Sequence, residues 1–239
     1  MANQLKGTIF YLYTNVRFTL IIFWIIISTI LALSLITSYF MSEGTISFQL
    51  SFSVYVFCTI IGTWTVKNAI PYSIKLGSTR KNLYVSLGIY FLGFALFNSI
   101  IANTINKFFE VVFEVKRVGG LVVIASNSST ESFTFFHVAQ FLGSNSWFTY
   151  VLVDAIICFF LLTSAFIIGL VFFRYGLIGG FVFLGIAMFT IIIGIAKGWL
   201  IEMIIHIFQD FSIVFFYQLF GVGLIIYLIS FIMLRRITI

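Results

Sequence analysis

The stretch YVLVDAIICFFLLTSAFIIGLVFFRYGLIGGFVFLGIAMFTIIIGIA, residues 150–196, decides the fold, and its only charged side chains are Asp154 and Arg174. A helix needs about 20 apolar residues to cross the roughly 30 Å hydrocarbon core of a bilayer. The stretch is therefore long enough for two crossings. We predict spans at 150–173 and 176–196, joined by a tight hairpin at Arg174 and Tyr175.

The composition of the whole chain agrees with a membrane location. Of the 239 residues, 62% are apolar and 8% are charged, and the mean hydropathy is +1.18. A soluble domain is about half apolar and about a quarter charged. Because too few polar residues remain to cover a core with a water-facing surface, the composition excludes a soluble enzyme, a disordered chain and a collagen-like rod. It indicates a multi-pass protein of the cell membrane.

Four further uncharged runs are long enough to span. They are continuously apolar and do not alternate between apolar and polar residues, so they favour helices over a β-barrel. We expect the first run to be retained as a span, because no cleavage motif follows it. The sequence thus predicts an all-α membrane protein in which residues 1–239 form a single transmembrane domain; the four runs are 18–40, 48–66, 83–106 and 211–234.

The distribution of charge predicts the orientation. If the amino terminus is cytoplasmic, nine of the 13 basic residues face the inner side and none of the acidic residues does. Such a bias of lysine and arginine sets membrane topology. Both termini are therefore predicted to be cytoplasmic, and the net charge of +6 needs no nucleic-acid partner. The nine inner bases are Lys6, Arg17, Lys67, Lys75, Arg80, Lys81, Arg174, Arg235 and Arg236.

Three segments outside the spans are also apolar in part. Residues 4–17 place Leu5, Ile9, Leu12, Tyr13 and Val16 at helical spacing, which is typical of an interfacial helix, although a frayed cytoplasmic end is the alternative. Residues 197–210 predict an outer interfacial or re-entrant helix. Residues 107–149 form the longest segment outside the spans, and its role is left open.

Residues 67–82, KNAIPYSIKLGSTRKN, are the most informative cytoplasmic segment. Pro71, the only proline, is expected to end or redirect the second span, because it lacks an N–H and disfavours helix before it. Gly77 supplies a flexible break, and either Ser78 or Thr79 can cap the third span. The segment is either a basic turn that follows the topology rule or a short surface helix at 71–76 that is presented to a cytoplasmic partner.

Catalytic and cofactor motifs are missing from the sequence. There is no G-x-x-x-x-G-K-[ST] loop for ATP and no H-E-x-x-H pair for zinc. The two histidines, His137 and His206, lie in different outer segments. We therefore do not expect this chain to be an enzyme, to bind a metal or to bind a cofactor of its own.

A few polar side chains lie within the predicted spans. Asp154 is near the outer end of its span, and we expect an interfacial acid in contact with water. Asn98 and Asn103 can form hydrogen bonds between helices. Cys58 and Cys158 lie in apolar runs, where cysteine is most often a small packing residue.

The predicted topology, together with Leu-Gly-Ser-Thr-Arg-Lys at residues 76–81, resembles the permease subunits of type-2 ABC exporters of Gram-positive bacteria. Many such permeases carry L-G-x-[ST]-R-[KR] between spans two and three, in the loop that bears the coupling helix for the ATPase. This chain departs from the family in having its longest outer segment between spans three and four instead of five and six. The ATPase-binding residues that the resemblance implies are Pro71, Tyr72, Ile74, Lys75, Leu76, Gly77, Ser78, Thr79, Arg80 and Lys81.

The resemblance also implies partners and a function. A separate ABC ATPase subunit would bind ATP and Mg, and a second permease subunit, identical or different, would complete the path through the lipid membrane. A lining rich in Phe, Ile and Leu suits an amphipathic peptide or lipid-like cargo. The alternative is a stand-alone six-helix membrane protein, of an immunity or substrate-binding type, with no ATPase.

Overall fold

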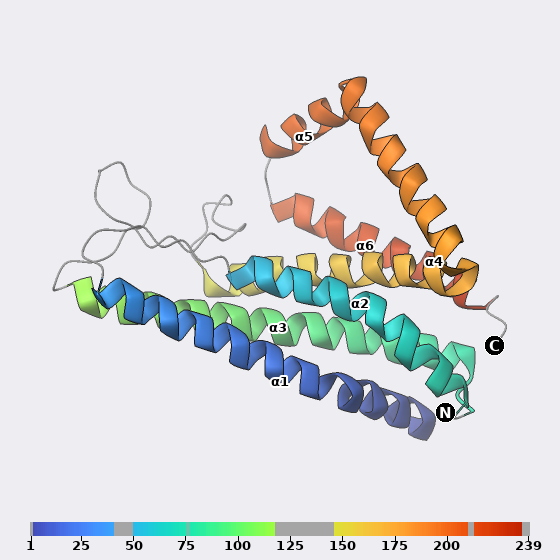
Figure 1. The fold of residues 1–239 in the computed structure, drawn as a ribbon, viewed down its shortest axis with the longest axis horizontal. Coiled ribbons are helices and arrows are strands. Elements are labelled where there is room, and N and C mark those ends of the chain that lie inside the picture. The colour runs from blue at the N-terminus through green and yellow to red at the C-terminus, as the bar shows by residue number, and fades with distance from the viewer. Residues whose placement is uncertain (1, 41–49, 76, 118–145, 210–212, 236–239) are drawn as a thin grey trace.

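The computed structural model describes residues 2–40, 50–75, 77–117, 146–209 and 213–235, and these are almost entirely helical, with no strand among them. The all-α prediction is therefore confirmed. Figure 1 shows the helices as a bundle with one arm that stands away from it. The helices are α1 (Ala2–Phe40), α2 (Leu50–Lys75), α3 (Arg80–Arg117), α4 (Trp147–Ala196), α5 (Trp199–Gln209) and α6 (Ile213–Arg235).

Among the described residues, five helices are long and apolar enough to cross a membrane, where the sequence predicts six spans. The difference lies in α4, whose 50 residues include both of the spans predicted between 150 and 196. A straight helix of this length measures about 75 Å, more than twice a bilayer core. However, α4 is not straight, and Figure 1 shows its second half turning back from the first.

Gly176 makes this reversal. Its φ of 70° and ψ of −173° lie in a region that only glycine adopts without strain. Glycines also close the bend, because a Cβ on Gly179 would lie 2.4 Å from the Cβ of Tyr175, and one on Gly180 would lie 2.2 Å from the Phe172 ring. A turn is thus present at Gly176, one residue after the predicted hairpin pair, but it lies within one long helical element whose two halves diverge (Figure 1).

The core of the bundle lies between α2, α3 and the first half of α4, and α6 packs on α4. Helices α2 and α4 make the closest pair. A Cβ on Gly62 would lie 2.7 Å from the carbonyl oxygen of Leu162 and 2.8 Å from the Cβ of Ala165, so the two backbones nearly touch there. Small residues that allow such an approach are the usual means of packing helices in lipid.

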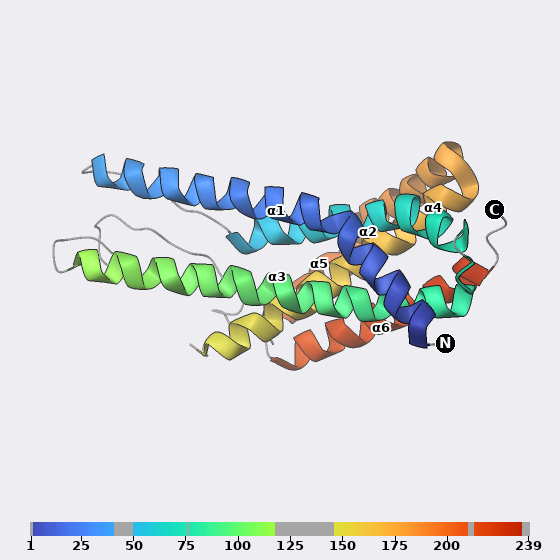
Figure 2. The ribbon, with the colours of Figure 1, turned by 90° about the horizontal axis from the view of Figure 1, so that it is seen from below.

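Helix α1 joins two elements that the sequence predicts separately, the interfacial helix 4–17 and the span 18–40. Figure 2 shows that its amino-terminal part runs at an angle to the rest. Its buried stripe is Thr8, Leu12 and Val16, whereas Tyr13, which the sequence places on the apolar stripe, is exposed. The α1 helix packs on α3 and, less extensively, on α2.

The outer segments are described in part. Helix α3 continues past the predicted end of the third span to Arg117, and residues 118–145 lie outside the described part of the chain. Helix α5 occupies the predicted outer helix 197–210 and follows a turn at Gly198, whose φ is 80°. The start of α5 packs against the end of α4, because a Cβ on Gly194 would lie 2.8 Å from the Trp199 ring.

Candidate functional site

The first candidate site is the connection between α2 and α3, which contains the predicted ATPase-binding residues. The N–H of Gly77 donates to the carbonyl of Ile74 at 2.9 Å, and the N–H of Ser78 donates to that of Ser73 at 3.0 Å. With a φ of 77° at Gly77, this pair of bonds is a Schellman cap that ends α2. The break predicted at Gly77 is therefore present, because α2 ends before this turn and α3 begins after it.

The next residue begins α3. The hydroxyl of Thr79 accepts the N–H of Asn82 at 3.3 Å, and the Thr79 carbonyl accepts the N–H of Leu83 at 2.9 Å. These are the bonds of an amino-terminal cap. Of the two predicted capping residues, Thr79 is confirmed and Ser78 is not.

The expectation that Pro71 ends α2 is wrong, because α2 continues through Pro71 to Lys75. Tertiary packing holds the last turn, since Ile70 and Ser73 are buried and Tyr72 stacks on Tyr11 of α1 with ring centroids 4.2 Å apart. Within the described residues, 71–75 is therefore the end of α2 and not a separate surface helix. Leu76 lies outside the described residues.

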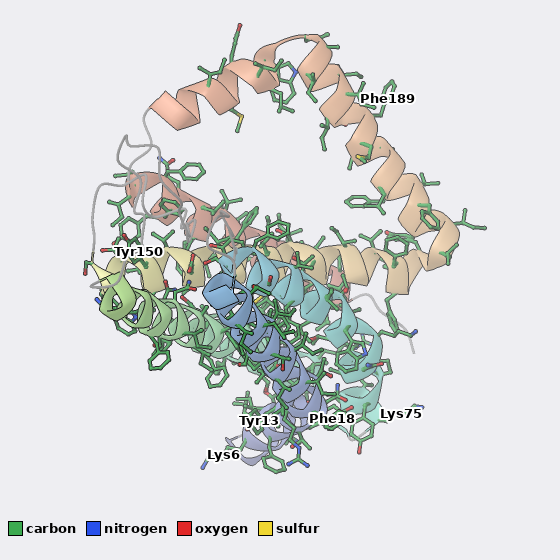
Figure 3. All side chains as sticks on the ribbon, turned by 60° about the vertical axis from the view of Figure 1, so that its left-hand side comes forward. Lys6, Tyr13, Phe18, Lys75, Tyr150 and Phe189 are labelled. Carbon is green, nitrogen blue, oxygen red and sulfur yellow. The ribbon has the colours of Figure 1, made fainter. Side chains whose placement is uncertain are left out.

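We call this end of α2, with the turn and the first residues of α3, the basic corner (residues 71–75 and 77–81). The exposed residues there are Tyr72, Lys75, Thr79, Arg80 and Lys81, and Ile74 packs against the core. Figure 3 shows Lys75 projecting from the bundle, with Lys6 of α1 at the same end. The structure thus brings the cationic residues of the predicted site together on one surface.

The start of α1 is tied to this corner. The Nδ2 of Asn82 donates to the Oε1 of Gln4 at 2.8 Å. Figure 1 shows that α6 ends and α4 turns at the same end of the molecule. The corner is therefore part of an end surface to which α1, α2, α3, α4 and α6 all contribute.

A second polar site, which the sequence did not predict, surrounds Asp154. Its carboxylate accepts the hydroxyl of Tyr55 at 2.5 Å, the Nδ2 of Asn103 at 2.8 Å and the hydroxyl of Ser51 at 3.3 Å. Asp154 is only 3% exposed, so the expected interfacial acid in contact with water is wrong. The reason is that α2 and α3 extend alongside this part of α4 and enclose the side chain.

The polar site is extended by one bond within α3 and one bond from α3 to α4. Within α3, the Nδ2 of Asn103 also donates to the Ser99 carbonyl at 3.0 Å, and the hydroxyl of Ser99 donates to the Val151 carbonyl of α4 at 2.5 Å. The predicted interhelical bond is confirmed for Asn103. Asn98 instead donates to the Phe94 carbonyl of its own helix at 2.9 Å.

The sequence holds a signal for this cluster. Ser51 and Tyr55 are four residues apart in α2, and Ser99 and Asn103 are four residues apart in α3, so each pair lies on one helix face. Two polar faces of this kind in apolar spans, together with one acid in a third span, indicate a shared polar contact. Chemically, the cluster holds a carboxylate in an apolar interior with neutral hydrogen-bond donors from two other helices.

The two cysteines are buried and carry free thiols, and Cys158 of α4 contacts Cys58 of α2. Their predicted burial as packing residues is confirmed. Among the described residues there is no group of three or more His, Cys, Asp and Glu side chains that could hold a metal ion. The side chains of His137 and His206 lie outside what the structure describes.

Comparison of the chain with known protein families, with curated proteins and with solved structures finds no match.

Proposed function

We propose that this chain is the membrane-spanning permease subunit of an ATP-driven ABC exporter and that its basic corner docks on a separate ATPase subunit. The observation that carries the proposal is the position of the corner. It projects exposed cations at the end of the molecule where α1 begins and α6 ends (Figures 1 and 3). By the positive-inside rule, this end faces the cytoplasm, where an ATPase is available.

The path through the membrane would be made by six crossings. Four are α1, α2, α3 and α6, and the two halves of α4 on either side of Gly176 supply the others. The resemblance to the exporter permeases implies that ATP and Mg bind to the partner, so this chain contributes the path and not the hydrolysis.

The Schellman cap and the Thr79 cap give the corner a fixed shape, and the Tyr11–Tyr72 stack and the Gln4–Asn82 bond tie it to α1. A push from a closing ATPase dimer on a corner built this way would move α1, α2 and α3 together. A soft loop at this position would absorb the same push, so the rigid turn supports a coupling role.

The cargo and the second permease subunit remain parts of the proposal. The second half of α4 exposes Leu177, Ile178 and Phe189 by 68%, 80% and 64% in the single chain. Such a surface is suited to lipid or to a second permease subunit, identical or different. A path lining rich in Phe, Ile and Leu, as the composition implies, favours an amphipathic peptide or lipid-like cargo.

A stand-alone membrane protein, of an immunity or substrate-binding type, is the second candidate. The observation that favours it is the brevity of the α2–α3 connection, in which one cap leads directly into the next and leaves no separate coupling helix. This candidate predicts full biological activity when the chain is expressed without an ATPase.

Charge reversal at the corner distinguishes the two candidates. In membranes of the native host, we expect Arg80→Glu combined with Lys81→Glu to reduce the co-purified ATPase by about tenfold or more. The substitutions would place like charges against each other across the interface, which costs several kcal/mol. Lys107→Glu is the matched control, because Lys107 is an exposed lysine of the same helix near its other end. An equal yield of ATPase from all three proteins would overturn the docking role of the corner.

A further inference from the structure

A groove between α1, α2 and α4 lies outside the basic corner and outside the cluster around Asp154. Its volume is about 830 Å³, and its lining includes Thr19, Trp64, Lys67, Ile168 and Phe172. Lys67 supplies the only charge in this lining. The hydroxyl of the neighbouring Thr63 donates to the Ile60 carbonyl of its own helix at 2.9 Å, so it adds little free polarity to the apolar walls.

The depth of Lys67 in the membrane follows from the length of α2. Lys67 comes 17 residues after Leu50, which begins the helix, so it lies about 26 Å along it. With a hydrocarbon core of about 30 Å, this places Lys67 close to the inner edge of the core. A lysine there extends its ammonium to the phosphate layer while its stem stays among the acyl chains.

A second groove supplies the comparison. It lies between α1 and α3, has a volume of about 670 Å³ and is lined by residues that include Trp24, Ser28 and Ile101. None of its lining residues is charged. Both grooves are apolar and similar in size, and each has a tryptophan in its lining, so Lys67 distinguishes one from the other.

We propose that the Lys67 groove is a binding site for an anionic phospholipid, with the phosphate at the ammonium of Lys67 and an acyl chain along Trp64, Ile168 and Phe172. Charge complementarity selects an anionic over a zwitterionic headgroup, because a net negative charge meets a base with no acid in the same lining. The apolar lining favours a lipid over free phosphate, because only a lipid has an acyl chain that can contact these side chains. The site is independent of ATPase docking, because its residues lie outside the basic corner.

Fluorescence quenching by brominated lipids tests the site in the full-length chain in vesicles. A protein that keeps only Trp64, through Trp24→Phe, Trp147→Phe and Trp199→Phe, reports on the Lys67 groove. We expect brominated phosphatidylglycerol to quench Trp64 at about fivefold lower mole fraction than brominated phosphatidylcholine at low salt, since one lysine near an anionic surface contributes a factor of this size.

Three controls accompany the measurement. Lys67→Gln should abolish the preference for the anionic lipid, Lys67→Arg should retain it, and a protein that keeps only Trp24 should show no preference. Equal quenching of Trp64 by the two lipids, or a preference that persists in Lys67→Gln, would overturn the site.

Native mass spectrometry gives a second readout that leaves the tryptophans in place. We expect wild-type protein to retain phosphatidylglycerol through detergent exchange and Lys67→Gln to lose it. Equal retention by the two proteins would contradict the proposal even if the tryptophan variants failed to fold. Inorganic phosphate should not displace the lipid at equal concentration. Displacement would contradict the lipid site, because it would show that the groove binds phosphate without the acyl chain.

Discussion

Asp154 shows how a single acidic side chain is accommodated inside an apolar bundle. On insertion scales an aspartate costs about 2.5–3.5 kcal/mol at the centre of a spanning helix, which is an upper bound for Asp154 near the end of its span. Hydrogen bonds between helices in membranes stabilise by about 0.6 kcal/mol on average and by up to about 1.7 kcal/mol. Three donors, from Ser51, Tyr55 and Asn103, can therefore offset much of the cost. The cluster also ties α2 and α3 to α4.

We predict that Asp154→Ala lowers the free energy of unfolding in micelles by about 2 kcal/mol, because it leaves buried donors without their acceptor. Asp154→Asn should lose less, since it keeps the shape and one acceptor oxygen. Unfolding followed by circular dichroism during titration with a denaturing detergent measures both. Glu202→Ala is the control, an exposed acid of α5 whose removal should change stability by less than about 0.5 kcal/mol. An Asp154→Ala protein as stable as wild type would refute the tie between helices.

The sequence revealed this cluster only in part. Asn103 could be predicted to bond across helices, because an amide in an apolar span needs a partner. The burial of Asp154 could not be predicted, because it depends on how far α2 and α3 extend beside α4. That extension is a property of the packed bundle and not of the span that contains the acid.

Glycines decide how the helices approach one another and where α4 turns. Gly62 brings α2 against the Leu162 carbonyl, and Gly176 reverses α4. At Gly62, atoms of α4 fill the space that a Cβ would need. At Gly176, the backbone has a positive φ that residues with a Cβ rarely adopt. The close pairing of α2 and α4 thus depends on missing Cβ atoms, at Gly62 in α2 and also at Gly169 in α4, where a Cβ would lie 2.9 Å from the Val66 side chain.

Two alanine substitutions test this point as a matched pair. Gly62→Ala should destabilise the protein by about 1–3 kcal/mol, because its Cβ would lie 2.7 Å from a backbone oxygen that cannot move aside easily. Gly93→Ala in α3 meets nothing within 4 Å and should be neutral or stabilising by up to about 1 kcal/mol. The detergent unfolding assay measures both, and equal effects would show that α2 and α4 are not held at this contact.

Element boundaries could be predicted less well than element type. Uncharged runs located the spans, but α1 and α3 continue through charged residues at one end, because charge ends an apolar run without ending a helix. Pro71 was misread for a related reason, since the packing of Ile70 and the Tyr11–Tyr72 stack hold the helix beyond it. The turn at Gly176 was predicted to within two residues by the charged and aromatic pair that precedes it.

The positions of the helix ends agree with the distribution of basic residues along the chain. The start of α1, the α2–α3 turn, the bend in α4 and the end of α6 lie at one end (Figures 1 and 2), where the sequence places most of its bases. An orientation with this end in the cytoplasm satisfies the positive-inside rule for every one of these segments. Under the proposed topology, the two halves of α4 would supply two crossings.

Cysteine labelling in intact cells tests the six crossings. In a protein with Cys58→Ala and Cys158→Ala, we expect an impermeant maleimide to label Lys197→Cys from outside and to leave Thr79→Cys and Tyr175→Cys unlabelled until the cells are opened. All three positions are exposed in the structure. Labelling of Lys197→Cys and Thr79→Cys from the same side would contradict the reversal of α4 across the membrane.

The most direct test of the proposed function is purification of the tagged chain from native membranes in two mild detergents, with mass spectrometry of whatever co-purifies. Our account predicts a stoichiometric soluble protein that carries a G-x-x-x-x-G-K-[ST] peptide, lost on charge reversal at Arg80 and Lys81. A preparation without any such ATPase in both detergents would contradict the exporter proposal and favour the stand-alone membrane protein.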